Sequence, residues 1–181
     1  MSDLIFADHP AIDWAFHERV AQIAQHLGLE ADYLMACMAF ETGLTFSPSV
    51  KNPRSTATGL IQFMSFTAKN LGTSTRALAK MTALEQLDYV EKYFAPWKGR
   101  LRTLEDVYMA ILWPKAIGRD LDYALFDRDA DTSRAYAVNK GLDTNRDGRV
   151  TKREAASKVR RLYDRGVRER IARQRQRGQE A

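Results

Sequence analysis

The sequence predicts a mainly α-helical, single compact domain that is interrupted by one long loop. Apolar residues recur at three- and four-residue steps along much of the chain, the spacing of an amphipathic helix. Residues 43–58 are rich in Pro, Ser and Thr, which break a helix and predict an ordered long loop or a short β-hairpin. Near the C-terminus, a loop with EF-hand spacing precedes an Arg-rich helix.

The first two helices are predicted by their apolar residues. Asp8 is the expected N-cap of the first helix, Pro10 fits its first turn, and Gly28 is the expected stop. A second helix is expected over about 31–42; because it is apolar on most sides, we expect it in the core, with Cys37 as a buried small residue. The apolar face of the first helix consists of Ile12, Phe16, Val20, Ile23 and Leu27.

Later helices are marked by capping and stop signals. Thr82 to Glu85 and Thr103 to Asp106 both resemble capping boxes that open a helix. Pro96 and Pro114 indicate where these helices end, since proline cannot continue a helix. The last helix is expected from about residue 152, fraying near 178.

The net charge of +5 comes from the C-terminus. The chain has 28 Lys and Arg against 23 Asp and Glu, but residues 158–181 alone carry +6 and residues 1–157 carry −1. We therefore expect no nucleic-acid partner, and propose the basic segment as a contact for an anionic cell envelope. One cysteine excludes an internal disulfide, no apolar run reaches the ~18 residues of a membrane span, and the N-terminus has no signal-peptide pattern.

Residues 143–154 have the spacing of an EF-hand calcium loop. Oxygen ligands fall at positions 1, 3, 5 and 12, with a glycine at position 6 and a backbone carbonyl at position 7. The expected ligands are Asp143, Asn145, Asp147, Arg149 through its carbonyl, and Glu154. Because sensor proteins pair two such loops and this chain has one, we expect a structural Ca²⁺. The alternative is an acidic turn in which Thr151 and Glu154 form a capping box for the last helix.

Glu41 is the catalytic candidate. It ends the apolar second helix and opens the polar loop, and a carboxyl among apolar neighbours has a raised pKa, as a general acid near neutral pH requires. The alternative is a Glu facing solvent, paired with Lys51 or Arg54.

The residues around Glu41 resemble a known family. Glu41-Thr42, the Pro-containing loop, and then Gly59-Leu60-Ile61-Gln62 are similar to the lysozyme-like superfamily, in its lytic transglycosylase and goose-type lysozyme branch. The later Ala-Tyr-Asn-Ala-Gly motif of that branch has its nearest counterpart at 107–114, where the Tyr-Asn pair is missing. The sequence from the Glu41 motif to the calcium-like loop resembles most the phage-encoded muramidases and virion-associated peptidoglycan hydrolases.

The resemblance implies a role for each matching residue. Glu41 would be the general acid and base, with Gln62, Ser55 and Thr58 binding sugar and Gly59 allowing close backbone approach. Tyr108 or Trp113 would take over part of the role of the missing motif, with Tyr108 as the expected substrate contact, while Phe63 and Met64 are expected to pack beneath the cleft. The remaining aromatic candidates for sugar stacking are Trp97 and Trp113.

The implied reaction is cleavage of the β-1,4 bond between N-acetylmuramic acid and N-acetylglucosamine. Hydrolysis normally needs a second carboxylate, and Asp88, Asp106 and Asp127 are the candidates, at no recognisable spacing from Glu41. This favours the lytic route, in which the muramyl 6-hydroxyl attacks and Glu41 acts alone. The expected organisation is a catalytic domain over 1–130, the calcium loop packed on it over 131–157, and a basic helix or tail over 158–181, in a monomer acting on the cell wall.

Two other functions compete with this one. A non-enzymatic calcium-binding helical module with a basic tail would explain the loop and the arginines, but not the Glu-Thr and Gly-Leu-Ile-Gln motifs. A basic amphipathic helix acting on membranes is the other, since apolar residues recur in the tail. The three histidines lie in one N-terminal segment without other ligands, so we assign them no metal or catalytic role.

Overall fold

The structure, a computed structural model, describes residues 3–53 and 55–179. Within these residues it contains eight α-helices, three 3-10 helices and a two-stranded sheet, so the mainly helical prediction is confirmed. The bounds are α1 Trp14–Leu27, α2 Ala31–Glu41, α3 Ser65–Asn70, α4 Thr75–Leu78, α5 Ala83–Phe94, η1 Ala95–Trp97, α6 Leu104–Leu112, η2 Pro114–Ala116, β1 Ala124–Asp127, α7 Ser133–Asn139, η3 Lys140–Leu142, β2 Arg149–Thr151 and α8 Lys152–Gln179.

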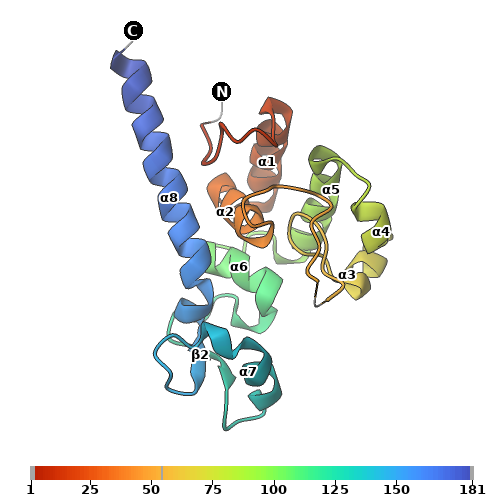
Figure 1. The fold of residues 1–181 in the computed structure, drawn as a ribbon, viewed down its shortest axis with the longest axis vertical. Helices are drawn as coiled ribbons and strands as arrows, with labels where there is room; N and C mark the ends of the chain where they lie inside the picture. Colours follow the sequence, from red (N-terminus) through yellow and green to blue (C-terminus); the bar gives the residue numbers. More distant parts are fainter. Residues whose placement is uncertain (1–2, 54, 180–181) are drawn as a thin grey trace.

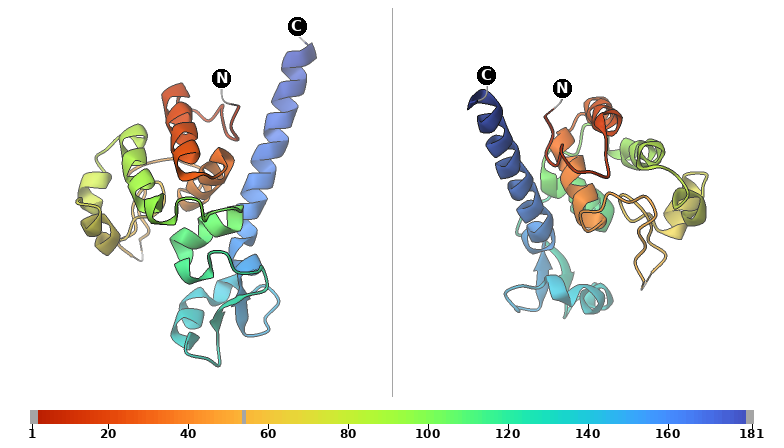
Figure 2. Two further views of the ribbon diagram at one scale, coloured as in Figure 1. Left: turned by 180° about the vertical axis from the view of Figure 1, so that it is seen from behind. Right: turned by 45° about the horizontal axis from the view of Figure 1, so that its top comes forward.

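Helix α2 is the centre of the molecule. It packs against α1, α6 and α8, and α1 also packs against α5 (Figure 1). Six consecutive residues, 34–39, are buried, which explains why this helix is apolar on all sides. Helices α3 and α4 lie on the far side of α5, away from α8, in each view of Figure 2.

Helix α1 begins later than its sequence pattern predicts. Asp13, not Asp8, is the N-cap, and its carboxylate accepts a hydrogen bond from the Phe16 amide at 2.9 Å. Residues 3–12 instead form turns whose apolar side chains enter the core, with His9 packed on Phe46 at a ring distance of 5.0 Å. The predicted stop is confirmed, since Gly28 adopts the left-handed conformation at φ +71°.

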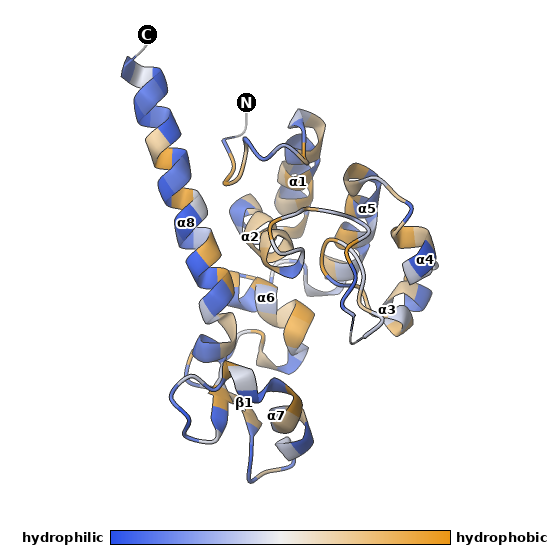
Figure 3. Ribbon diagram, in the orientation of Figure 1, coloured by the Kyte–Doolittle hydropathy of each residue, from blue (hydrophilic) through white to orange (hydrophobic). Residues whose placement is uncertain are grey.

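Helix α8 is a single helix that runs along α6 and α2, and its last turns extend beyond the bundle (Figure 1). The boundary expected at residue 158 falls inside it. Gly166 permits close contact with the N-terminal segment, because a Cβ there would lie 2.7 Å from the Cβ of Ile5. Figure 3 shows hydrophilic residues over much of α8, interrupted by hydrophobic positions. In the described residues, no helix is long and apolar enough to span a membrane.

A small unit formed by β1, α7 and β2 lies at one end of α8 (Figure 1). β1 and β2 are antiparallel, with Phe126 opposite Val150. A buried ion pair fixes this end of α8 to α6: the Lys152 Nζ lies 2.6 Å from an Asp106 carboxylate oxygen and donates to the Arg119 carbonyl. Thr103 caps α6 as predicted, but its expected capping-box partner, Asp106, binds Lys152 and the Gly118 amide instead.

Candidate active site

Glu41 is the last residue of α2, and the next residues turn the chain sharply into the loop. The Thr42 hydroxyl donates to the Met38 carbonyl at 2.7 Å and accepts from the Phe46 amide at 3.0 Å. Leu44, at φ +67°, donates its amide to Ala39 and so closes the helix end. Glu41 therefore stands at a rigid junction between the buried helix and the polar loop.

The Glu41 carboxyl lies in an environment that disfavours its charge. Its side chain is half-buried, and burial raises its pKa from the usual 4.5 to about 7. Its place at the C-terminal, electronegative end of α2 acts in the same direction. No ion pair joins it to Lys51 among the described residues, and Arg54, the other partner considered, lies outside them. A carboxyl with this pKa is partly protonated at neutral pH, as a general acid must be.

Two tyrosines and a cysteine lie within the electrostatic reach of Glu41. Burial and, secondarily, the charge of Glu41 raise the pKa of Tyr93 to about 12 and raise the pKa of Tyr108 and Cys37. The Tyr93 hydroxyl donates to the Ala110 carbonyl at 2.7 Å. Tyr108, the predicted substrate contact, is only 4% exposed and leaves little ring surface for a sugar. Its ring packs instead against Phe40, the residue before Glu41.

The loop residues expected to bind sugar organise the loop itself. The side-chain Nε2 of Gln62 donates to the backbone carbonyls of Gly59 at 3.1 Å and Val50 at 3.4 Å. Thr58 is buried and forms isolated β-bridges with the segments on either side of it. Ser55 is exposed, and its hydroxyl accepts the Ala57 amide. The residues lie in one loop, as predicted; their contact with sugar stays a prediction.

The hydrophobic residues expected near the cleft differ in their burial and in the residues they contact. Phe63 is buried, as expected, and packs edge-on against Tyr93 at a ring distance of 6.1 Å. Met64 was expected to pack with it, but it is 47% exposed, at the N-cap position of α3. Trp97 packs on Tyr93 at 5.5 Å and so belongs to the surroundings of Glu41, whereas Trp113 packs on Phe126 at 5.1 Å, in the β1–β2 unit.

Gln86 on α5 is a buried residue that holds the loop, and the sequence analysis missed it. Its Oε1 accepts the Leu60 amide at 2.6 Å, and its Nε2 donates to the carbonyls of Pro48 and Leu78 at 3.1 and 3.0 Å. A Cβ on Gly59 would lie 2.2 Å from Gln86 Oε1, so the close approach at Gly59 is to this side chain. The signal was present: a polar residue interrupts the apolar stripe of α5.

The cause of the raised Glu41 pKa is burial. The three candidates for a second carboxylate are each paired with a cation. The pairs are Asp88 with Arg19 at 2.7 Å, Asp106 with Lys152 at 2.6 Å and Asp127 with Arg149 at 2.9 Å. Each of these carboxylates is thus already engaged by a cation.

The loop at 143–154 is wrapped around its first residue. Asp143 accepts hydrogen bonds from the amides of Arg146 at 2.7 Å and Gly148 at 3.0 Å and from the Tyr136 hydroxyl at 2.8 Å. Asn145 and Asp147 each accept an amide two residues further on. The backbone is thus folded by side-chain oxygens, as a compact turn requires.

Glu154 closes this loop as the capping-box alternative predicts. Its Oε2 accepts the Thr151 amide at 3.0 Å, and its own amide donates to the Thr151 hydroxyl at 3.2 Å. Its Oε1 accepts the Thr144 amide. Residues 3–53 and 55–179 contain no group of three or more His, Cys, Asp or Glu side chains arranged to hold a metal. The donor chemistry of the loop still suits Ca²⁺, because carboxylate, amide and carbonyl oxygens are the ligands this ion takes.

Comparison with known proteins adds one finding. Residues 18–96 match the family model of the transglycosylase SLT domain. This range holds most of α1 and all of α2 to α5, with Glu41, the loop and Gln86. The comparison with curated proteins gives no match.

Proposed function

We propose that this chain acts on peptidoglycan and that Glu41 is its single catalytic acid and base. The match of residues 18–96 to the transglycosylase SLT domain, a lysozyme-like domain, supports this proposal. The observation that carries the proposal is the half-buried Glu41 carboxyl with a pKa of about 7 at the end of α2. The bond cleaved is the β-1,4 linkage between N-acetylmuramic acid and N-acetylglucosamine.

In the first step, protonated Glu41 donates its proton to the glycosidic oxygen while the bond from that oxygen to C1 of the muramyl residue breaks. Positive charge develops at C1, as in other glycosidases. In the second step, the Glu41 carboxylate removes the proton of the muramyl 6-hydroxyl, whose oxygen attacks C1. The product is a 1,6-anhydromuramyl end, and Glu41 is protonated again. The cation-bound state of Asp88, Asp106 and Asp127 supports this route over attack by water.

The test compares Glu41→Gln with Glu18→Gln, a matched change of an exposed glutamate on α1. We expect Glu41→Gln to abolish clearing of purified cell walls in a zymogram, and Glu18→Gln to keep it. Near-full activity in Glu41→Gln would contradict the assignment. Mass spectrometry of the released muropeptides then separates the routes, because anhydro products lack one water. A wild type that clears no wall would leave the non-enzymatic calcium-binding module as the better interpretation.

We propose phage lysis or wall penetration as the biological setting. The support is the likeness of the whole run, from the Glu41 motif to the calcium-like loop, to phage-encoded muramidases. Detection of this chain in purified virions by mass spectrometry would favour wall penetration. Its appearance only in the lysing host would favour lysis.

We also propose that the 143–154 loop binds Ca²⁺ and stabilises the C-terminal unit. Asp143, Asn145, Asp147, the Arg149 carbonyl and Glu154 would hold the ion. Glu154 would then exchange its hydrogen bonds to Thr144 and Thr151 for the cation.

Binding at 100 times the dissociation constant would stabilise the fold by about 2.7 kcal/mol, or roughly 5–10 °C in Tm. Asp147→Ala should remove this shift, while Asp131→Ala, an exposed acid outside the loop, should keep it. Absence of any Ca²⁺-dependent shift in the wild type would refute the site.

A further inference from the structure

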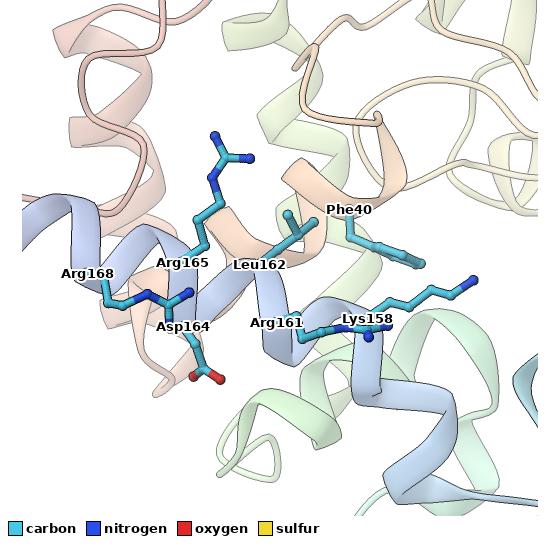
Figure 4. Close-up of a pocket in the computed structure, with 7 residues that line it drawn as sticks. All are labelled: Phe40, Lys158, Arg161, Leu162, Asp164, Arg165 and Arg168. Carbon is cyan, nitrogen blue, oxygen red and sulfur yellow. The ribbon is translucent and has the colours of Figure 1, made fainter. Parts of the chain in front are cut away.

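A basic groove lies between the end of α2 and the middle of α8 (Figure 4). Its volume is about 470 Å³. Phe40 and Leu162 give it an apolar part, and charged side chains from α8 line the rest (Figure 4). These charged residues are Lys158, Arg161, Asp164, Arg165 and Arg168.

The cations of this groove differ from those on the docked face of α8. On the docked face, the arginines pair with carboxylates of other elements. Arg160 lies 2.8 Å from Glu105 and Arg170 lies 2.5 Å from Asp32, both of which are largely buried, and Arg173 lies 3.0 Å from the exposed Asp8.

In the groove, Arg165 has a partner on its own helix, Glu169 at 2.7 Å. Lys158, Arg161 and Arg168 are exposed and form no ion pair within the described residues. Three cations at spacings of three and seven residues share one helix face, so their field is concentrated on the groove.

The groove begins one residue from the catalytic candidate. Phe40 directly precedes Glu41 and packs edge-on against Tyr108 at a ring distance of 5.5 Å. Tyr108 in turn lies within the electrostatic reach of Glu41. A ligand in the groove would therefore lie at the same end of α2 as Glu41.

We propose that this groove binds the stem peptide of the peptidoglycan strand, an inference that rests on the proposed function. The stem peptide is attached to the muramyl residue whose bond is cleaved, and it carries carboxylates together with a free amino group. Lys158, Arg161 and Arg168 bind its carboxylates, and Asp164 binds its amino group. The methyl groups of its alanines pack on Phe40 and Leu162. A polymer of phosphates fits less well, because Asp164 repels it.

The test uses Arg161→Ala/Arg168→Ala, with Arg175→Ala/Arg177→Ala as control. Both variants remove two positive charges from exposed positions of α8, but only the first pair lines the groove. The first readout is kcat/KM on glycan strands with their peptides and on strands stripped by an amidase. We expect the ratio of kcat/KM on peptide-bearing strands to kcat/KM on stripped strands to fall about fivefold from its wild-type value in the groove variant. The control should keep the wild-type ratio. The expected change is modest because exposed ion pairs contribute modestly.

The second readout is calorimetric binding of soluble stem peptide, which needs no catalysis. The groove variant should bind it about fivefold more weakly, and Asp164→Asn should weaken binding only when the peptide amino group is free. An unchanged ratio with unchanged peptide affinity would overturn the proposal. So would a variant that loses affinity for a soluble glycerol-phosphate polymer but keeps it for the peptide. Peptide binding by a wild type that cleaves no glycan would refute the proposed function and leave the groove standing.

Discussion

Replacing Glu41 by glutamine should inactivate the protein and, above pH 7, make it more stable. Glutamine has nearly the same shape as glutamate but carries no charge. Burial raises the pKa of Glu41 from 4.5 to about 7, so the folded protein tolerates the ionised form less well than the unfolded chain does. The variant removes this unfavourable ionisation from the folded state.

The magnitude and the pH window follow from that shift. Below about pH 4.5 the carboxyl is protonated in both states, and the two proteins should be equally stable. Between pH 4.5 and 7 the folded state holds a proton that the unfolded chain has lost, so wild-type stability falls as pH rises. Above pH 7 the full difference applies, up to about 3 kcal/mol, because each pKa unit corresponds to about 1.4 kcal/mol. For a chain of this length that is roughly 6–12 °C in Tm.

The assay is urea or thermal unfolding of wild type and Glu41→Gln at pH 4, 6 and 8. Glu18→Gln is the control, since changes at exposed positions stay within about 0.5 kcal/mol. A gain that grows with pH confirms a buried, destabilising carboxylate. Equal stability at pH 8, or a gain of the same size at pH 4 and pH 8, would refute the reasoning.

Three further outcomes are expected. Wall cleavage should decline as pH rises through about 7, because Glu41 must be protonated to act as acid; a rate that keeps rising to pH 9 would contradict this. Lys152→Met should lower the free energy of unfolding by about 3–5 kcal/mol, since it leaves the buried Asp106 uncompensated; Lys158→Met is the exposed control, and urea titration measures both. Gln86→Leu should cost about 3 kcal/mol or more and reduce wall cleavage, because it leaves buried backbone groups without partners; thermal unfolding and turbidity assays would show neither loss if the loop holds itself.

The sequence predicted the elements whose signals are local. Helix α2 was expected from its apolar run, Gly28 as a stop from its conformational freedom, and the Thr82 and Glu85 capping box from a four-residue pattern; all three are confirmed. Glu41 was selected by its place at the end of an apolar helix, and its burial and raised pKa agree with that argument.

Features that depend on distant segments were not predictable in this way. Asp8 resembled an N-cap, but the N-terminal turns pack on Phe46 and α8, and α1 begins at Trp14. Asp106 fits a capping box locally, yet a lysine 46 residues later binds it. Sequence spacing cannot show which distant side chain will compete for a local partner.

The 143–154 loop shows that one pattern can satisfy two structures. Its spacing predicts calcium ligands, and the same Thr151 and Glu154 form a capping box in the structure. Both arrangements use the same oxygens, once toward backbone amides and once toward a cation. The pattern of residues therefore cannot decide between them, and a calcium titration of the protein is the measurement that does.

The charge distribution gains a different meaning from the structure. The sequence places +6 on the last 24 residues and suggests a separate basic tail. Arg160 and Arg170 instead pair with the largely buried carboxylates of Glu105 and Asp32. Through Arg170 and Arg173 the helix also holds the N-terminal segment, by hydrogen bonds to the Asp3 and Leu4 carbonyls. Removing the helix would thus expose unpaired carboxylates and apolar surface of the core. The charge left for a partner is the unpaired part, and much of it faces the groove that begins beside Glu41. Basicity in this chain is therefore a property of the surface where α8 meets the end of α2 more than of an appended tail.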